Sequence, residues 1–182
     1  KAGTATATFT VEPRTVLSLT QGPVGTRVTA TGAGFPAGRG GLPVLFDTQQ
    51  VASAASEPKG SLTIAFTVPP LPAGSYQVTI GSGSPVGFTV TSSLSIGTPD
   101  GPPGTIVTLT GSGFGANTAI SITFDGAHIR SVSADNEGSL SATLQVPVAA
   151  GGPRSIGISE GSRVLAQATF TVTPLLSLDR LN

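Results

Sequence analysis

The side chains that could carry out chemistry are few in this sequence, and they are scattered along the chain. The single histidine, His128, lies near Ser131 and Asp135. A Ser-His-Asp triad needs a histidine that is held between the nucleophile and an orienting carboxylate. Residues that are neighbours on one strand do not converge in this way. We therefore expect His128 to be an exposed structural residue, and we predict no catalytic residues and no enzymatic activity.

The best candidate for a metal site is the turn formed by Asp135, Asn136 and Glu137, followed by Gly138. Calcium requires about six to eight oxygen ligands, and no second acidic cluster stands nearby in the sequence. A similar turn earlier in the chain contains Lys59. An ordinary Asx-type turn explains these residues better than a metal site does. We predict no bound metal and no cofactor.

The composition excludes several classes of protein. Charged residues make up 10% of the chain, with Lys+Arg 9 balancing Asp+Glu 9, whereas soluble domains have roughly 25%. A chain without a basic patch is not expected to bind nucleic acid. No apolar run approaches the roughly 18 residues of a membrane span. With Cys 0, the chain has neither disulfides nor thiolate metal sites. We predict an extracellular or cell-surface protein whose weakly charged surface favours association.

The elements that must position these residues are organised by a repeated strand, Phe-Thr-Val. It begins at Phe9, Phe88 and Phe170, at intervals of 79 and 82 residues. Each copy is followed by a second recurring stretch, Leu-Ser-Leu at 17–19, Leu-Ser-Ile at 94–96 and Leu-Ser-Leu at 176–178. A fixed period of this length indicates tandem domains. If the first stretch closes a domain and the second opens the next, the chain holds two complete units.

Short alternating segments separated by glycine and proline turns, with no helical period, predict an all-β fold of two tandem β-sandwiches. We expect about seven strands in each unit and a turn at residues 22–25. An extra strand is expected at each chain end. The expected divisions are a spare closing strand at 1–13, sandwiches at 14–92 and 93–174, and a spare opening strand at 175–182.

Side chains at the inward positions of these strands are expected to form two cores. The first core is predicted to contain Phe35, Phe46, Leu62, Ile64, Phe66, Val78 and Phe88. The second is predicted to contain Phe114, Phe124, Leu140, Leu144, Ile156 and Phe170.

Three stretches of the second unit carry a family resemblance. They are Val-Thr-Leu-Thr-Gly-Ser-Gly-Phe at 107–114, Ile-Thr-Phe-Asp-Gly at 122–126 and Val-Pro at 146–147. Together with their counterparts in the first unit, they resemble the IPT/TIG type of immunoglobulin-like domain. The first unit departs from the pattern with Ala33 and with Asp47-Thr48 in place of Asp-Gly. The resemblance implies a sandwich fold and, from similar repeats in bacterial and archaeal surface proteins, a role as spacer, stalk or adhesive module.

The two spare strands raise the question of assembly. Residues 4–11 alternate strictly, with Ala5, Ala7, Phe9 and Val11 on one face and threonines on the other. Ordering such a strand by itself costs more backbone entropy than its burial returns. We therefore expect an assembly interface formed by a set of apolar residues at the two chain ends: Ala5, Ala7, Phe9, Val11, Leu176 and Leu178.

Two arrangements would order these strands. Either further domains continue the tandem array on both sides, or each subunit lends a terminal strand to a sheet edge of the next copy. The predicted function is a structural repeat of an extracellular fibre, stalk or surface layer, whose partners are copies of itself or adjacent Ig-like domains. The alternative is a spacer or accessory module of a larger secreted enzyme or adhesin.

Overall fold

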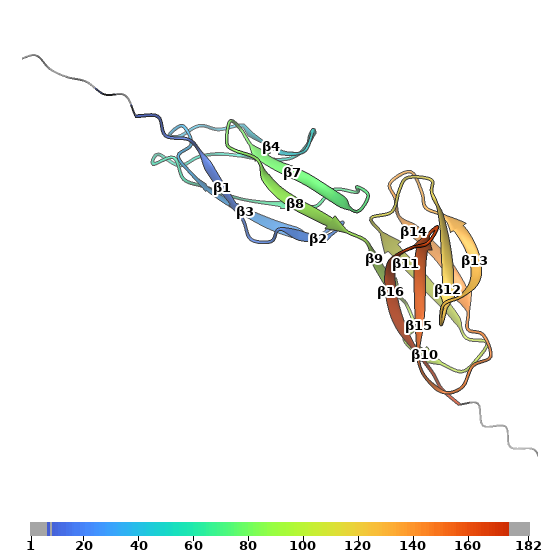
Figure 1. The fold of residues 1–182 in the computed structure, drawn as a ribbon. Helices are drawn as coiled ribbons and strands as arrows, with labels where there is room; N and C mark the ends of the chain where they lie inside the picture. Colours follow the sequence, from blue (N-terminus) through green and yellow to red (C-terminus); the bar gives the residue numbers. More distant parts are fainter. Residues whose placement is uncertain (1–6, 8, 175–182) are drawn as a thin grey trace, which may run out of the picture. The chain divides into compact units, whose positions relative to one another are not determined.

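The structure is a computed structural model that describes residue 7 and residues 9–174 (Figure 1). Regular secondary structure in these residues consists of sixteen β-strands in four sheets. The described chain divides near Val90 into two compact units. Each unit contains one three-stranded and one five-stranded sheet. The predicted all-β fold with two tandem sandwiches is therefore confirmed.

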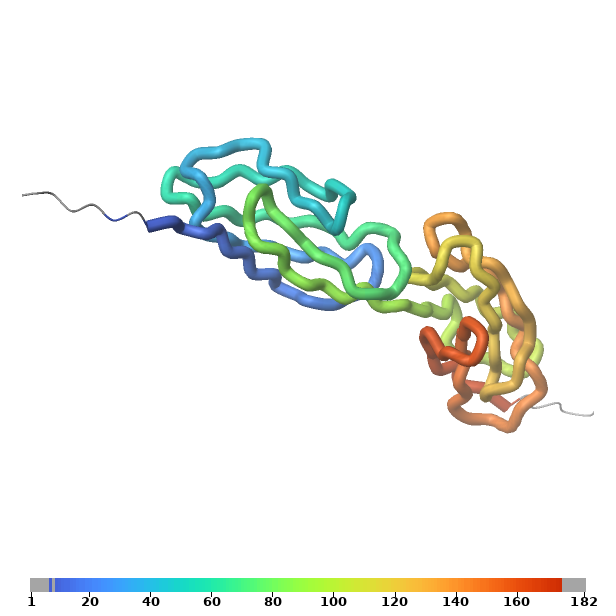
Figure 2. Tube along the Cα trace, turned by 45° about the horizontal axis from the view of Figure 1, so that its top comes forward, coloured from blue at the N-terminus to red at the C-terminus, as the bar shows by residue number. Residues whose placement is uncertain are grey.

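The first unit consists of eight short strands. They are β1 (Arg14–Leu17), β2 (Gln21–Pro23), β3 (Arg27–Ala33), β4 (Leu42–Phe46), β5 (Gln49–Ala54), β6 (Leu62–Thr67), β7 (Gly74–Ile80) and β8 (Val86–Thr91). One sheet has the strand order β1-β3-β6, and the other has the order β2-β8-β7-β4-β5. Figure 2 follows the chain through both layers.

The second unit repeats this plan. Its strands are β9 (Ser93–Ile96), β10 (Asp100–Gly101), β11 (Ile106–Ser112), β12 (Ala119–Phe124), β13 (Ala127–Ser133), β14 (Leu140–Gln145), β15 (Gly152–Glu160) and β16 (Arg163–Val172). The sheet orders are β14-β11-β9 and β10-β16-β15-β12-β13. Equivalent strands keep the same register, since Arg27 pairs with Thr67 in the first unit and Ile106 pairs with Gln145 in the second.

Each unit has eight strands in the structure, where the sequence predicted about seven. The short strand β2 occupies part of the turn expected at 22–25, and β10 is its counterpart in the second unit. β10 runs parallel to β16, with Asp100 opposite Thr171 and Gly101 opposite Val172. Because these short strands are rich in glycine, proline and polar residues, their composition is that of a turn.

The core of the first unit is centred on Phe46. Its ring lies edge-on to Phe66 of the opposite sheet, with centroids 6.4 Å apart, and edge-on to Phe88, with centroids 5.6 Å apart. All but one of the residues predicted for this core are buried. The exception is Ile64, which is half-buried. It lies on β6, an edge strand that has a neighbouring strand on one side only.

The core of the second unit contains all six of the residues predicted for it. Phe114, Leu144, Ile156 and Phe170 are at most 1% exposed. Partly buried residues of β9, Leu94 and Ile96, close the core from the side of the three-stranded sheet. This strand was expected to open the unit.

A glycine on β11 makes room for the phenylalanine that follows the strand. A Cβ atom at Gly111 would lie 2.9 Å from the ring of Phe114. The backbone N–H of Phe114 donates to the carbonyl oxygen of Gly138 over 3.1 Å, which fixes the far side of the loop. Gly32 and Phe35 hold the same relation in the first unit, where a Cβ would lie 2.5 Å from the ring.

The burial of Phe114 gives a direct test of the fold. We expect Phe114→Ala to lower the free energy of unfolding by about 3–5 kcal/mol, because it removes a buried ring and leaves a cavity. Urea unfolding followed by far-ultraviolet circular dichroism measures this loss. The matched control is Phe9→Ala, which removes a ring that is 86% exposed and should leave stability unchanged. A similar loss for both variants would contradict the assigned core.

Candidate functional site

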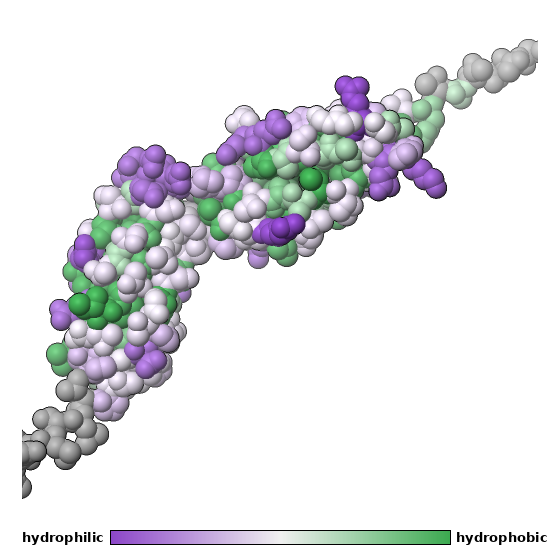
Figure 3. Space-filling view, turned by 180° about the vertical axis from the view of Figure 1, so that it is seen from behind, coloured by the Kyte–Doolittle hydropathy of each residue, from purple (hydrophilic) through white to green (hydrophobic). Residues whose placement is uncertain are grey.

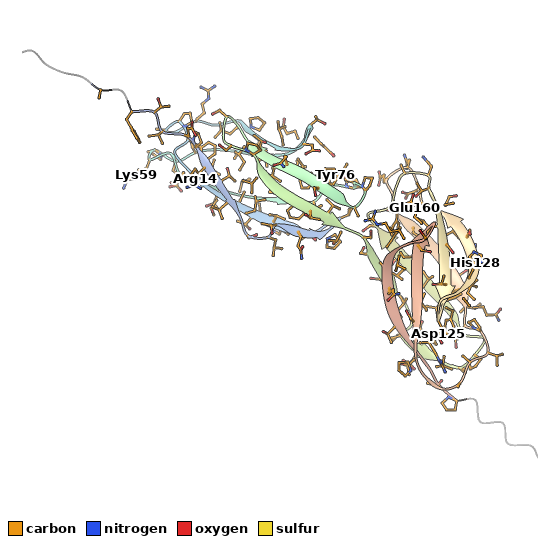
Figure 4. The ribbon with its side chains drawn as sticks, viewed as in Figure 1. Arg14, Lys59, Tyr76, Asp125, His128 and Glu160 are labelled. Atoms are coloured by element: carbon orange, nitrogen blue, oxygen red, sulfur yellow. The ribbon has the colours of Figure 1, made fainter. Side chains whose placement is uncertain are left out.

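His128 lies on β13 and is exposed. Its Nε2 atom is 3.2 Å from the hydroxyl oxygen of Ser131, three residues along the same strand. Figure 4 shows His128 on this outer strand, away from Asp125 at the neighbouring hairpin turn. Asp135, the carboxylate close to His128 in sequence, is occupied by backbone groups of its own turn. His128 and Ser131 therefore form an exposed hydrogen bond, and the carboxylate of Asp135 bonds to its own turn instead of orienting His128.

Asp135 organises the turn that was the best candidate for a metal site. Its Oδ1 atom accepts hydrogen bonds from the backbone N–H groups of Glu137, over 2.9 Å, and of Ser139, over 2.8 Å. This is the geometry of an Asx turn, in which the carboxylate replaces a backbone acceptor. Asn136 and Glu137 are exposed beside it. In the described part of the chain, no group of three or more His, Cys, Asp or Glu residues could hold a metal ion.

Two aspartates at equivalent hairpin turns bind the strand next to them. The N–H of Asp125 donates to the Ser155 carbonyl over 2.8 Å, and the N–H of Ser155 donates to Asp125 Oδ1 over 3.0 Å. Asp47 makes the same pair of bonds with Gln77, each over 2.7 Å. Both aspartates have positive φ, 50° at Asp47 and 49° at Asp125. They act as turn formers that also fix β7 and β15.

The residue that precedes the partner of each aspartate, Ser155 or Gln77, differs between the units. In the second unit, Arg154 Nη1 forms an ion pair with Asp125 Oδ2 over 3.0 Å. In the first unit, Tyr76 takes the place of the arginine, with its ring centroid 5.5 Å from that of Phe46. Burial raises the pKa of the Tyr76 hydroxyl above its ordinary value, and the charge of Asp47 raises it further.

The apolar residues of the N-terminal segment are exposed. Ala7 and residues 9–13 have no regular secondary structure, and the other positions of the strand expected over 4–11 lie outside the described residues. Phe9 is 86% exposed and Val11 is 59% exposed. A strand needs a partner strand to bond with, and in the structure none pairs with Ala7 or residues 9–13. Ala5, Leu176 and Leu178 lie outside the described residues.

The last part of the segment nevertheless lies against the first unit in a repeated way. A Cβ atom at Gly34 would lie 3.0 Å from Val11 and 3.1 Å from the carbonyl oxygen of Glu12. At the equivalent Gly113, a Cβ atom would lie 2.9 Å from the carbonyl oxygen of Thr91, at the end of β8. Val11 and Glu12 therefore lie beside Gly34 in the same way as Thr91 lies beside Gly113.

A shallow groove of about 440 Å³ lies beside the edge strands β13 and β14. It is lined by Ile106, Ile129, Arg130, Thr143, Leu144 and Gln145. Ile106 is 68% exposed and Ile129 is 37% exposed. Arg130 Nη1 donates to the carbonyl oxygen of Thr143 over 3.3 Å.

This groove is not among the sites predicted from the sequence. The signal was Ile106, a large apolar residue at an outward position of a strand whose inward positions are Val107 and Leu109. Its burial pattern alternates as expected for a sheet with one face toward solvent. What could not be read from the sequence is which strands stand at the sheet edges.

The comparisons with known proteins bear on the fold. A sequence model described as the IPT/TIG domain matches residues 15–95 and 90–172. A comparison with curated proteins gave no match. Within the described residues, no helix is long and apolar enough to cross a membrane.

Similar solved structures include an adhesin and a domain of intimin. The adhesin InvE of Yersinia pseudotuberculosis is 12% identical with a TM-score of 0.41, over 91% of this chain and 60% of that one. The D00-D0 domain of intimin is 13% identical with a TM-score of 0.37, over 89% of this chain and 100% of that one.

A third similar structure is SGBP-B from a mixed-linkage glucan utilization locus of Bacteroides ovatus, solved with a mixed-linkage heptasaccharide. It is 15% identical with a TM-score of 0.36, over 93% of this chain and 46% of that one. The chain thus spans 60% of the adhesin's length and about half of the glucan-locus protein's. At these identities and scores, the likenesses carry no argument about function.

The Asx turn predicts how the chain responds to metal removal. We expect a chelator to leave the melting temperature unchanged, because the Asp135 carboxylate already accepts two backbone hydrogen bonds. Asp135→Ala should lower the free energy of unfolding by about 1–3 kcal/mol, since both N–H groups lose their acceptor. Differential scanning calorimetry with and without EDTA tests both expectations. A large drop in melting temperature with EDTA would show that the turn binds a metal.

Tyr76 predicts an alkaline titration that can be read without interference, because the chain has Tyr 1 and Trp 0. Phenolate absorbance should give a midpoint above 10.0. Asp47→Asn keeps an acceptor for Gln77 but removes the charge, so the midpoint should fall while staying above the ordinary value, since burial is the larger cause.

The matched control for this titration is Asp125→Asn in the other unit, which should leave the Tyr76 midpoint unchanged. The folded-state pKa is raised, so the unfolded chain loses its phenolic proton first. The contribution of the Tyr76 hydroxyl to the free energy of unfolding is therefore fully present below about pH 10. It decreases as the pH rises through the folded pKa. A midpoint at or below the ordinary value would contradict the assigned environment.

Proposed function

The chain belongs to the IPT/TIG family through two tandem domains, and on that basis we propose that it is a structural repeat of an extracellular fibre, stalk or surface layer. In this proposal it has no catalytic role. Its partners are copies of itself, joined head to tail through β-strand edges. The apolar N-terminal segment of one copy is held by a sheet edge of the next.

The observation that carries the proposal is the contrast between the three Phe-Thr-Val copies. In β8, Phe88 and Val90 are each 1% exposed. In β16, Phe170 is 0% exposed. Phe9 is followed by the same Thr-Val but is 86% exposed. A stretch with the pattern of a closing strand, left outside both sandwiches, favours burial against another unit.

Energetics support strand addition at an edge. Burying the side chain of Phe9 contributes about 1.5–3 kcal/mol, which alone does not offset the entropy lost when the segment is ordered. An added strand also gains a row of backbone hydrogen bonds with the edge that receives it. Because the segment and the receiving edge lie on different parts of the chain, the contact is head to tail and can repeat from copy to copy.

The surface supports an extracellular assembly. On the face shown in Figure 3, the most hydrophilic residues form separate patches on a surface that is otherwise apolar or weakly polar. The formal net charge is zero at pH 7. A surface of this kind offers little electrostatic repulsion between copies. Since the chain has no cysteine, its stability is independent of the redox state of its surroundings.

A second candidate is a spacer or accessory module within a longer secreted enzyme or adhesin. The observation that favours it is the contact at Gly34, where Val11 and Glu12 approach as Thr91 does at Gly113. In this arrangement residues 7–11 would be the closing strand of a preceding domain. The two candidates share the burial of Phe9 and differ in whether separate copies associate.

Self-association separates the two candidates. We expect light scattering to show a molecular mass that rises with concentration, and electron microscopy to show beaded fibres. Phe9→Asp should keep the protein monomeric, because a charge would enter the apolar contact. At concentrations where the unchanged chain is monomeric, the two melting temperatures should be equal, since Phe9 is 86% exposed in the single chain.

Thr10→Asp is the matched control, because Thr10 faces away from Phe9 and Val11 in an extended strand. This variant should assemble as the unchanged chain does. A chain that stays monomeric at every concentration would refute self-assembly and leave the spacer module as the function.

A further inference from the structure

We propose that the groove beside β13 and β14 in the second unit is the acceptor for residues 7–12 of another copy. This inference rests on the proposed function and names the surface that receives the segment. The segment adds as a strand to β14 and lays Phe9 and Val11 over the apolar lining.

The edges of the described sheets narrow the choice of acceptor. A segment of six residues needs an edge of comparable length, which leaves β5, β6, β13 and β14 among the strands at the ends of sheets. Exposed large apolar side chains on or next to these four are confined to Ile129 on β13 and Ile106 beside β14. The sandwiches already contain their own closing strands, so the segment can add only at an edge.

The groove matches the segment in pattern. Ile106 and Ile129 provide apolar contacts at its two sides, and Phe9 and Val11 project from one face of an extended segment. Val11 is 59% exposed even where it meets Gly34 of its own chain, so most of its surface remains available. The apolar surface of the segment thus meets apolar surface on the acceptor.

The groove also matches the segment in charge. Glu12 directly follows Val11, and the groove contains one charged residue, Arg130. In the single chain, Arg130 donates to the Thr143 carbonyl oxygen, so an outward carbonyl of β14 is able to accept a donor at this place. In the complex, a backbone N–H of the segment takes over this carbonyl, and Arg130 is released to pair with Glu12.

The first unit lacks the same acceptor. Arg27 stands where Ile106 stands in the second unit, since Arg27 pairs with Thr67 as Ile106 pairs with Gln145. A charged side chain in place of Ile106 opposes burial of Phe9 beside it. The segment that precedes the first unit therefore docks on the second unit of the next copy, which gives a contact of one polarity.

Disulfide trapping tests the register and the place of docking. The chain has no cysteine of its own, so every crosslink comes from introduced residues. Val11→Cys is combined in turn with a cysteine at each outward position of β14, because in the proposed docking Val11 lies on the same face as these side chains and Ile106. These positions are Ser141, Thr143 and Gln145, and the controls are the equivalent positions of β6 in the first unit, Thr63, Ala65 and Thr67.

Under mild oxidation of the full chain, at least one β14 combination should give a ladder of covalent polymers. Its yield should be at least tenfold above that of the equivalent β6 combination. Equal or stronger crosslinking at β6, or a dimer from a β14 cysteine alone, would overturn the groove as the acceptor for this segment. A ladder absent from every combination would overturn it as well, while loss of self-association in Phe9→Asp would still support the proposed function.

A charge exchange supplies a second measurement that depends on no crosslink. Glu12→Arg and Arg130→Glu should each weaken self-association about fivefold, as measured by sedimentation. The double variant should restore it to within about twofold. Arg27→Glu, at the equivalent place in the first unit, should have no effect. If the double variant is weaker than either single variant, Glu12 and Arg130 do not meet and the proposed docking is wrong.

Discussion

Each sandwich depends on the close approach of a phenylalanine ring to a glycine backbone. In the second unit a Cβ atom at Gly111 would lie 2.6 Å from the carbonyl oxygen of Ser93 and 2.9 Å from the ring of Phe114. The absence of a side chain therefore allows two things at once, namely the pairing of β9 with β11 and the seating of the ring in the core. The N–H of Phe114 is then held by the loop that ends at Gly138. Strand pairing, core packing and loop position are in this way determined by one site.

The structural use of these residues limits where a functional site can lie. The side chains that first suggest chemistry are used to build turns: Asp47 and Asp125 bind the backbone of neighbouring strands, and Asp135 closes an Asx turn. What remains available for partners is the set of strand edges and the exposed apolar residues near them. On a surface with few charges, the groove beside β13 and β14 combines two exposed isoleucines with one arginine. In the proposed docking, the asymmetry between the units matters more than their likeness, because it would separate a donor end from an acceptor end.

Much of the fold could be predicted because two independent signals agreed, the long-range repeat and the local alternation. Phe46, Phe88 and Phe170 could be assigned to cores from parity alone, since a side-chain period of two leaves one choice of face. Edge positions could not be predicted, because the order of strands in a sheet depends on pairings distant in sequence. For that reason Ile64 was placed in a core although it lies half-buried on an edge strand, and Ile106 was not recognised as part of a groove. The short strands β2 and β10 were missed because turn-forming residues make up much of their sequence.

The parallel pairing of β10 with β16 has a mechanical consequence. β10 lies near the start of the second unit and β16 lies at its end, and the two are linked by bonds from the N–H of Thr171 to the Pro99 carbonyl and from the N–H of Thr173 to the Gly101 carbonyl, 2.8 and 2.9 Å long. Tension applied at the two ends of the unit pulls these parallel strands past each other along their length. The bonds lie across the direction of pull, so they share the load and must break together, whereas a hairpin pulled from its open end loses its bonds one at a time. The unit is therefore clamped against stretching along the chain, and this resistance comes from a strand of two residues.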